Sequence, residues 1–267
     1  MDNLNRSLAP FSSDLWDHID AAAVQAAKAV LTGRRFLEVE GPFGLGLTAL
    51  EVGVDNFCRD PGEHEAAAIG SRALAVPMLR KSCRLSARRL AAYLDKGMPL
   101  NLTEIEDAAE AVARREEDII YHGQPEFGLS GLLNADGRIE LPRGDWGNLD
   151  TALNDVLAAV TALDDAGFHG PYALVLPPVH YNNLFRHYEH TDLLQVEHLK
   201  SVCTLGVYKT LIDRPLVVDS HAGRLIIGQD LRVGYSGSDG IHYLLFVCES
   251  LVLRLDEPGA VCVLAGQ

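Results

Sequence analysis

The sequence of 267 residues predicts an α+β protein with at least two sub-regions, and two patterns support this. Apolar residues recur at helical spacing in several long segments before residue 170. Beyond residue 216 they gather instead in short continuous runs that are typical of buried strands. Hydrophobic residues make up 48% of the chain and charged residues 22%, which are values of a globular protein and exclude a disordered one.

The charge of the chain excludes several classes of partner. Lys and Arg number 23 and Asp and Glu number 37, which gives a formal net charge of −14. Such an acidic surface repels phosphate groups, which argues against a nucleic-acid or membrane partner. No run approaches the roughly 18 apolar residues of a membrane span, and the N-terminus lacks a signal pattern, so we expect a cytoplasmic protein. The mean hydropathy is nevertheless +0.05, which indicates more apolar surface than a lone monomer would bury.

The first predicted element is a helix. Ser12 or Ser13 can cap it, apolar residues recur at helical spacing as far as Leu31, and Gly33 ends it. A short strand-like run, Phe36–Glu40, comes next.

Residues 47–76 are polar and mixed, with a turn at Asp60-Pro61-Gly62. We expect them to form an extended arm or hairpin that has little core of its own and touches neighbouring molecules.

The longest predicted helix of the middle region begins at a capping box in residues 101–104 and ends at Gly123. Glu116 falls on the apolar stripe of this helix. We expect it to pair with Arg114 or Arg115 at the boundary of the core.

The remaining elements lie between residue 124 and the C-terminus. Residues 124–148 are rich in Gly, Pro and Asn and predict a loop, and a helix runs from Asp150 to Gly167. A buried strand, Tyr172–Leu176, precedes a helical stretch that starts at Pro177. The strands predicted after it are Leu216–Val218, Leu225–Ile227, Ile241–Cys248, Leu251–Leu255 and Val261–Leu264.

The motifs that could carry catalysis are weak. Residues 44–49 fit a loose G-x-G-x-x-A pattern, but the segment after them lacks the helix of a dinucleotide site, so we expect a turn. Residues 234–238 have the wrong order for a nucleophile elbow, and we expect Ser236 in a turn between strands. The five cysteines include no C-x-x-C pair. We expect no enzyme and no cofactor.

A metal site is the remaining alternative. Histidines cluster near carboxylates at His180, His187, His190 and His198. Ligation needs a helical i, i+4 pair or a converging carboxylate. The segment around His187 and His190 is instead typical of an exposed polar loop.

Several segments resemble encapsulin shell proteins, in order and over nearly the whole chain. They are Leu4–Pro10, Gly33–Arg35, Val39–Pro42, Asp118–Gly123, Gly170–Val175 and Ile227–Tyr235. The resemblance implies the fold of tailed-phage major capsid proteins. It divides the chain into an N-terminal helix and arm on the lumenal face (1–46), an extended loop (47–76), a peripheral domain with a long spine helix (77–126), an axial domain (127–215) and C-terminal strands that return to the peripheral domain (216–267).

By this resemblance the protein is a non-enzymatic subunit of an icosahedral shell. The shell encloses a cargo enzyme, a peroxidase or a ferritin-like iron oxidase, which carries a C-terminal targeting peptide. The residues that match the docking surface for this peptide are Ala27, Val30, Leu31, Arg34, Glu38, Asp230 and Leu231. The residues expected at the fivefold pore are His187, Glu189, His190, Thr191 and Asp192.

Two alternatives stay open at this point. Proteins of this kind have been labelled as bacteriocins or peptidases, although a hydrolase needs a catalytic triad that the sequence lacks. A prophage capsid protein would share the fold and would enclose DNA, which the charge of −14 disfavours.

Overall fold

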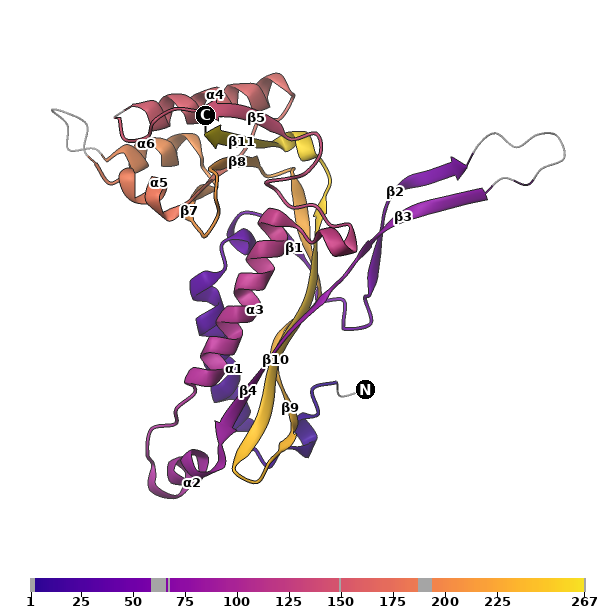
Figure 1. Ribbon diagram of the computed structural model, residues 1–267, viewed down its shortest axis with the longest axis vertical. Helices are drawn as coiled ribbons and strands as arrows, with labels where there is room; N and C mark the ends of the chain where they lie inside the picture. The colour runs from indigo at the N-terminus through magenta and orange to yellow at the C-terminus, as the bar shows by residue number, and fades with distance from the viewer. Residues whose placement is uncertain (1–2, 59–65, 67, 149, 187–193, 267) are drawn as a thin grey trace.

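The structure is a computed structural model that describes residues 3–58, 66, 68–148, 150–186 and 194–266. The molecule consists of a long body, a small body at one end of it, and a hairpin that projects sideways from their junction (Figure 1). Within the described residues, no helix combines the length and the apolar character that crossing a membrane requires.

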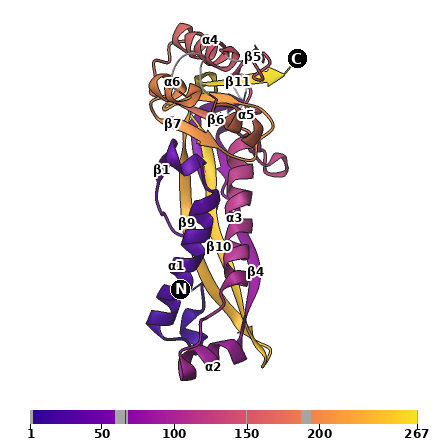
Figure 2. The ribbon, with the colours of Figure 1, turned by 90° about the vertical axis from the view of Figure 1, so that its left-hand side faces the viewer.

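The long body is built on a four-stranded sheet. The strand order is β1 (Glu38–Glu40), β9 (Gly223–Ser238), β10 (His242–Leu255) and β4 (Met78–Ser86). Strand β10 is antiparallel to both of its neighbours, and β1 is parallel to β9. Helices α1 (Ser13–Val30) and α3 (Thr103–His122) cover one face of this sheet (Figure 2), and α2 (Ala87–Lys96) comes after β4 at the far end.

Close packing of α1 on α3 forms the centre of the long body. The buried positions of α1 include Ile19, Ala23 and Ala27, and those of α3 include Ala109 and Ala113. Because many of these side chains are small, the two helices approach each other closely over the sheet. The first predicted helix is confirmed together with its cap, since Ser12 Oγ accepts a hydrogen bond from Leu15 N at 3.3 Å.

The small body holds a second core around a five-stranded sheet. The strand order is β5 (Ile139–Arg143), β11 (Val261–Gly266), β8 (Leu216–Asp219), β6 (Tyr172–Leu176) and β7 (Gly206–Lys209). Helices α4 (Thr151–Asp165), α5 (Pro178–Asn183) and α6 (Gln195–Val202) pack around it (Figure 1). Short 3-10 helices lie at Arg6–Leu8, Gly33–Arg35, Pro125–Phe127 and Pro258–Ala260.

The C-terminal strands of residues 216–267, which the resemblance groups together, are divided between the two sheets. Strands β9 and β10 belong to the long body, whereas β8 and β11 complete the sheet of the small body. The physical reason is that the two pairs of strands differ in length and in burial. Every residue of β8 and the first four of β11 are buried, which suits the middle of a sheet covered on both faces. The longer strands β9 and β10 pair with each other as a hairpin.

Three local predictions need correction. The predicted break between Cys248 and Leu251 is a register shift inside the continuous strand β10. Ser236 lies in β9 and not in a turn, because the strand continues to Ser238. The capping box is wrong, because Glu104 Oε2 accepts a hydrogen bond from Arg84 N of strand β4 and does not cap its own helix.

Strands β2 (Ala49–Cys58) and β3 (Ala68–Ala75) pair antiparallel as the projecting hairpin (Figure 1). Most of β3 is exposed, and among the described side chains those at the base of the hairpin pack on a small apolar cluster with Val76 and Ile226. The prediction of a hairpin with little core is therefore confirmed. The predicted turn at Asp60-Pro61-Gly62 lies outside the described residues.

Candidate functional site

A groove of about 370 Å³ lies between the C-terminal half of α1 and strand β9. Its apolar floor consists of Ala27, Leu31 and Leu231, which are buried, and of Val24, which is 36% exposed. The remaining lining residues are charged: Lys28, Arg34, Arg35 and Asp230. The groove thus offers apolar surface with a charged rim.

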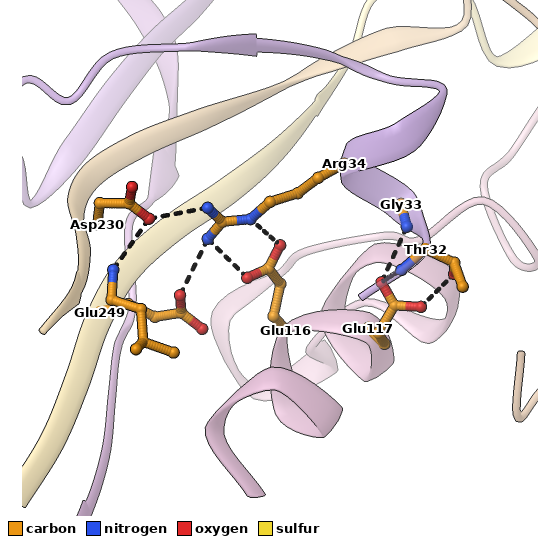
Figure 3. Close-up of polar contacts among 8 residues, drawn as sticks. Thr32, Gly33, Arg34, Glu116, Glu117, Asp230 and Glu249 are labelled. Carbon is orange, nitrogen blue, oxygen red and sulfur yellow. Dashed lines mark hydrogen bonds and ion pairs between the residues drawn. The ribbon is translucent and has the colours of Figure 1, made fainter. Parts of the chain in front are cut away.

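The charged end of the groove is fixed by Arg34 (Figure 3). Its guanidinium donates two hydrogen bonds to Glu116 of α3, at 2.6 and 2.8 Å. It also donates to Asp230 of β9 at 2.8 Å and to Glu249 of β10 at 3.0 Å. The Arg34 side chain therefore joins the turn after α1 to α3, β9 and β10, all of which are far from that turn in the sequence.

The partner predicted for Glu116 is wrong. Its carboxylate is fully buried and binds Arg34, whereas Arg114 pairs with Glu110 and Arg115 with Asp118 on the exposed side of α3. The physical reason is the direction in which the Glu116 side chain leaves helix α3. Glu116 lies on the stripe that faces α1 and the sheet, so it meets the arginine that enters from the turn.

Burial sets the protonation of this cluster. Loss of water and the negative charge of Glu116 raise the pKa of Glu249 well above its ordinary value, and loss of water also raises the pKa of Glu116. Oε2 of Glu249 accepts from Arg34, whereas Oε1 has no hydrogen-bond partner among the described atoms. Burial alone would lower the pKa of Arg34, but its carboxylate partners raise it above its ordinary value. Burial opposes ionisation of Asp230 as well, yet Arg34 lowers the pKa of that carboxyl.

The next residue of α3 holds the backbone of the same turn (Figure 3). Oε1 of Glu117 accepts hydrogen bonds from the amides of Thr32 and Gly33 at 2.8 and 2.9 Å. Its other oxygen accepts from the Thr32 hydroxyl and, at 3.1 Å, from Thr210 of the small body. A Cβ at Gly33 would lie 2.6 Å from Cδ1 of Ile120, so the turn approaches α3 more closely than a larger residue permits.

A second ionic contact joins α1 to β9 one turn before Val24. Asp20 accepts from Arg6 at 2.6 Å and from Arg232 at 3.3 Å. Arg6 also donates to the carbonyl of Val233, and its guanidinium carbon lies 4.6 Å from the centroid of the Trp16 ring. Ion pairs therefore join the segment of α1 and its following turn to β9 at two places, at the charged rim of the groove and one turn before it.

Five of the seven predicted docking residues line this one groove: Ala27, Leu31, Arg34, Asp230 and Leu231. The other two lie elsewhere. Val30 lines a different cavity on the opposite side of α1, and Glu38 lies on β1 with its nearest cation, Arg224, at 3.8 Å.

Sequence reasoning missed the buried partners Glu116 and Glu249 and the lining residues Val24, Lys28 and Arg35. A carboxylate on the apolar stripe of a helix was the available signal for Glu116.

The predicted pore residues His187, Glu189, His190, Thr191 and Asp192 lie outside the described residues. The residue before them is described. Arg186 donates to the backbone carbonyls of Gly147 at 2.7 Å and of Trp146 at 3.0 Å, so its charge is held by its own subunit.

The described residues place no group of three metal-ligating side chains together. Residues 44–49 lead into strand β2 and not into the helix that a dinucleotide site needs. A groove with an apolar floor and fixed charges at its ends suits binding of a chain segment.

The fold is similar to those of capsid subunits. It matches the virus-like particle of Pyrococcus furiosus with a TM-score of 0.73 and 21% identity, which covers 94% of this chain and 100% of that one. It matches the capsid of the myovirus phage XM1 with a TM-score of 0.62 and 18% identity, over 88% of this chain and 90% of that one. The expected fold of tailed-phage capsid proteins is confirmed.

Sequence comparison identifies the family. Residues 1–252 match the Linocin_M18 family, described as an encapsulating protein for peroxidase. The type 1 encapsulin shell protein EncA of Myxococcus xanthus is 32% identical over 279 aligned positions, which cover 99% of this chain and 97% of that protein. The chain therefore belongs to the encapsulin shell proteins.

Proposed function

We propose that this chain is the subunit of a cytoplasmic nanocompartment, a closed icosahedral shell that assembles from many copies and encloses a cargo enzyme. Its family membership and its capsid fold support the shell. The family description supports a peroxidase as one class of cargo. A closed shell also accounts for the positive mean hydropathy of so acidic a chain, because neighbours cover apolar surface.

The groove between α1 and β9 is the docking site that we propose for the targeting peptide of the cargo. The observation that carries this proposal is the convergence of Ala27, Leu31 and Leu231 with Arg34 and Asp230 in one groove, from segments about 200 residues apart. Apolar side chains of the peptide would be buried against the floor, and each would contribute roughly 1.5–3 kcal/mol to the free energy of binding. The charged residues of the groove would determine the register of the bound peptide more than its affinity.

The bodies also have proposed roles. The long body would be the peripheral domain, with α3 as its spine helix, and the small body would be the axial domain that surrounds the fivefold axis. The β2–β3 hairpin would be the extended loop that contacts neighbouring subunits. Its exposure and its pairing only within itself support this role.

Val24→Asp tests the docking proposal. Val24 is exposed on the groove, so the variant places a charge on the floor without changing the buried core. Leu157→Asp is the matched control, because Leu157 is an exposed apolar residue, 42% accessible, on helix α4. Cargo and shell are co-expressed, and the cargo content of purified particles is measured.

We expect both variants to assemble. Val24→Asp should weaken cargo binding at least about tenfold, the factor that 1.4 kcal/mol represents, and Leu157→Asp should load normally. Normal loading of Val24→Asp would reject the groove as the docking site. If the particles contain nuclease-protected DNA in place of cargo protein, the prophage-capsid alternative holds.

A further inference from the structure

A cavity of about 610 Å³ lies on the other side of the last turn of α1 from the docking groove. Its walls come from both bodies. Ala29 and Val30 of α1 and Arg114 of α3 belong to the long body, whereas Lys209 and Leu211, at and after the end of β7, belong to the small body. Cavities of this volume at the junction of two structural units are the usual form of small-molecule sites.

The carboxylates in this cavity already have partners. Glu117 accepts hydrogen bonds from Thr32, Gly33 and Thr210. Asp118 pairs with Arg115 and lies 3.2 Å from Nδ1 of His122. Both acids are therefore engaged within this chain: neutral donors hydrogen-bond Glu117, and the charge of Arg115 offsets that of Asp118.

Two cations in the cavity are held loosely. Arg114 pairs with Glu110 at 3.3 Å, but both side chains are about half exposed, and such pairs on a helix surface are weak. The ammonium of Lys209 lies 5.3 Å from the centroid of the Tyr181 ring, and no ion pair with a described carboxylate holds it. Both cations can therefore turn to a ligand at little cost.

The cavity also has apolar surface that water reaches. Val30 is half-buried in its wall, and Leu211 is 69% exposed beside it. A ligand that contacts both the two cations and the apolar wall must combine a negative head with an apolar part.

We propose that this cavity binds a small amphipathic anion, with a carboxylate or phosphate head between Arg114 and Lys209 and an apolar part against Val30 and Leu211. Because Arg114 belongs to the long body and Lys209 to the small body, an occupant links the two bodies. It thereby stabilises one angle between them, and in a shell that angle sets the curvature of the wall. This proposal does not depend on the identity of the cargo or on docking in the groove.

Calorimetric titration of the purified protein with octanoate, octyl phosphate and inorganic phosphate tests this proposal. The two octyl probes distinguish a carboxylate head from a phosphate head, and inorganic phosphate lacks the apolar part. We expect at least one octyl probe to bind, and to raise the unfolding temperature, because a ligand that binds only the folded state stabilises it. Inorganic phosphate should bind much more weakly.

The variants are Arg114→Gln and Lys209→Met, both at exposed positions that leave the core intact. Each should weaken the tighter probe about tenfold, the loss expected for one charge-assisted hydrogen bond. Arg88→Gln and Lys96→Met, at exposed positions of α2, are the matched controls and should bind as the wild type does. Val24→Asp should also bind normally, because Val24 lines the other groove.

Several results would overturn the assignment. The assignment is wrong if neither octyl probe binds, or if inorganic phosphate binds as tightly as octyl phosphate. It is also wrong if the controls lose as much affinity as the cavity variants do, or if Val24→Asp abolishes binding. Assembly of each variant is checked by negative-stain imaging, so a failure of this site is distinguishable from a failure to form shells.

Discussion

At the scale of single residues, Arg34 connects the candidate site to the core. It binds the buried acids Glu116 and Glu249 on one side and Asp230 at the rim of the groove on the other. Burial and the charge of Glu116 raise the pKa of Glu249, which favours its neutral form and lessens the repulsion between the two buried carboxyls.

Glu249→Gln should remove a pH dependence of stability. The pKa of Glu249 is raised above its ordinary value of 4.5 by folding, so the stability it contributes is present at low pH and is lost as pH rises through the folded pKa. A glutamine keeps the hydrogen bond from Arg34, because its side-chain carbonyl still accepts, and it cannot ionise. Denaturant unfolding from about pH 5 to about pH 9 should therefore show a flatter profile for this variant than for the wild type.

Glu197→Gln is the control for Glu249→Gln, because Glu197 is half exposed and forms a surface ion pair with Lys200 at 2.9 Å. It should keep the wild-type profile. If Glu249→Gln loses stability with rising pH as steeply as the wild type does, another group causes the pH dependence.

Gly33→Ala tests the close contact of the turn with α3. The added Cβ would lie 2.6 Å from Cδ1 of Ile120, and overpacking of this kind costs about 1–3 kcal/mol. Ile120→Val removes that δ-methyl group. The double variant should therefore be less destabilised than the sum of the two single variants, as measured by urea unfolding in a double-mutant cycle. Additive effects would mean that the turn adjusts without touching Ile120.

The residues of the site could be predicted only in part. Arg34, Asp230 and Leu231 came from the resemblance, and their convergence in one groove is a finding of the structure. The partner of Glu116 could not be predicted from spacing, because Arg34 is 82 positions away and two arginines lie next to Glu116 in the sequence.

At the scale of elements, amphipathic helices were predictable, whereas two edge strands, β4 and β5, were not. Helices α1, α3 and α4 bury one stripe each and show clear periodicity. Strand β5 contains Pro142, which an edge strand tolerates, and its segment was predicted as loop. Strand β4 is also an edge, and its exposed arginines obscure the alternation that buries Leu79, Cys83 and Leu85.

Removal of the β2–β3 hairpin should separate folding from assembly. The amide of Val76 donates to the carbonyl of Thr48 at 2.9 Å, so the two ends of the hairpin already lie together and a short Gly-Ser turn can replace residues 49–75. We expect a folded, dispersed subunit that forms no shells, because the hairpin contributes little to either main core. Circular dichroism reports folding and size-exclusion chromatography reports assembly. Shells of normal size from this variant would show that the hairpin is not an assembly element.

At the scale of the whole molecule, two bodies and a projecting hairpin form a shape that leaves apolar surface uncovered. Phe43 at 60% and Ile69 at 58% exposure lie at or near the hairpin, and Leu94 at 61% and Ile241 at 68% lie toward the far end of the long body. A subunit enclosed by neighbours on several sides would cover such residues.

The predicted pore should give the assembled shell a pH-dependent selectivity. In a ring, Glu189 and Asp192 attract cations above the ordinary histidine pKa of about 6.5, and protonated His187 and His190 reverse the sign below it. A small cation should therefore enter faster at about pH 8 than at about pH 5.5, and a small anion more slowly. Stopped-flow uptake by a dye-loaded shell measures both rates. If replacement of both histidines by alanine leaves the pH profile unchanged, the pore lies elsewhere.

The central claim is that many copies of this chain form a closed shell without any other protein. The most direct test expresses the chain alone and combines size-exclusion chromatography with light scattering and negative-stain imaging. We predict uniform, closed particles of megadalton mass. A soluble monomer or dimer, with no particles in the images, would contradict the account.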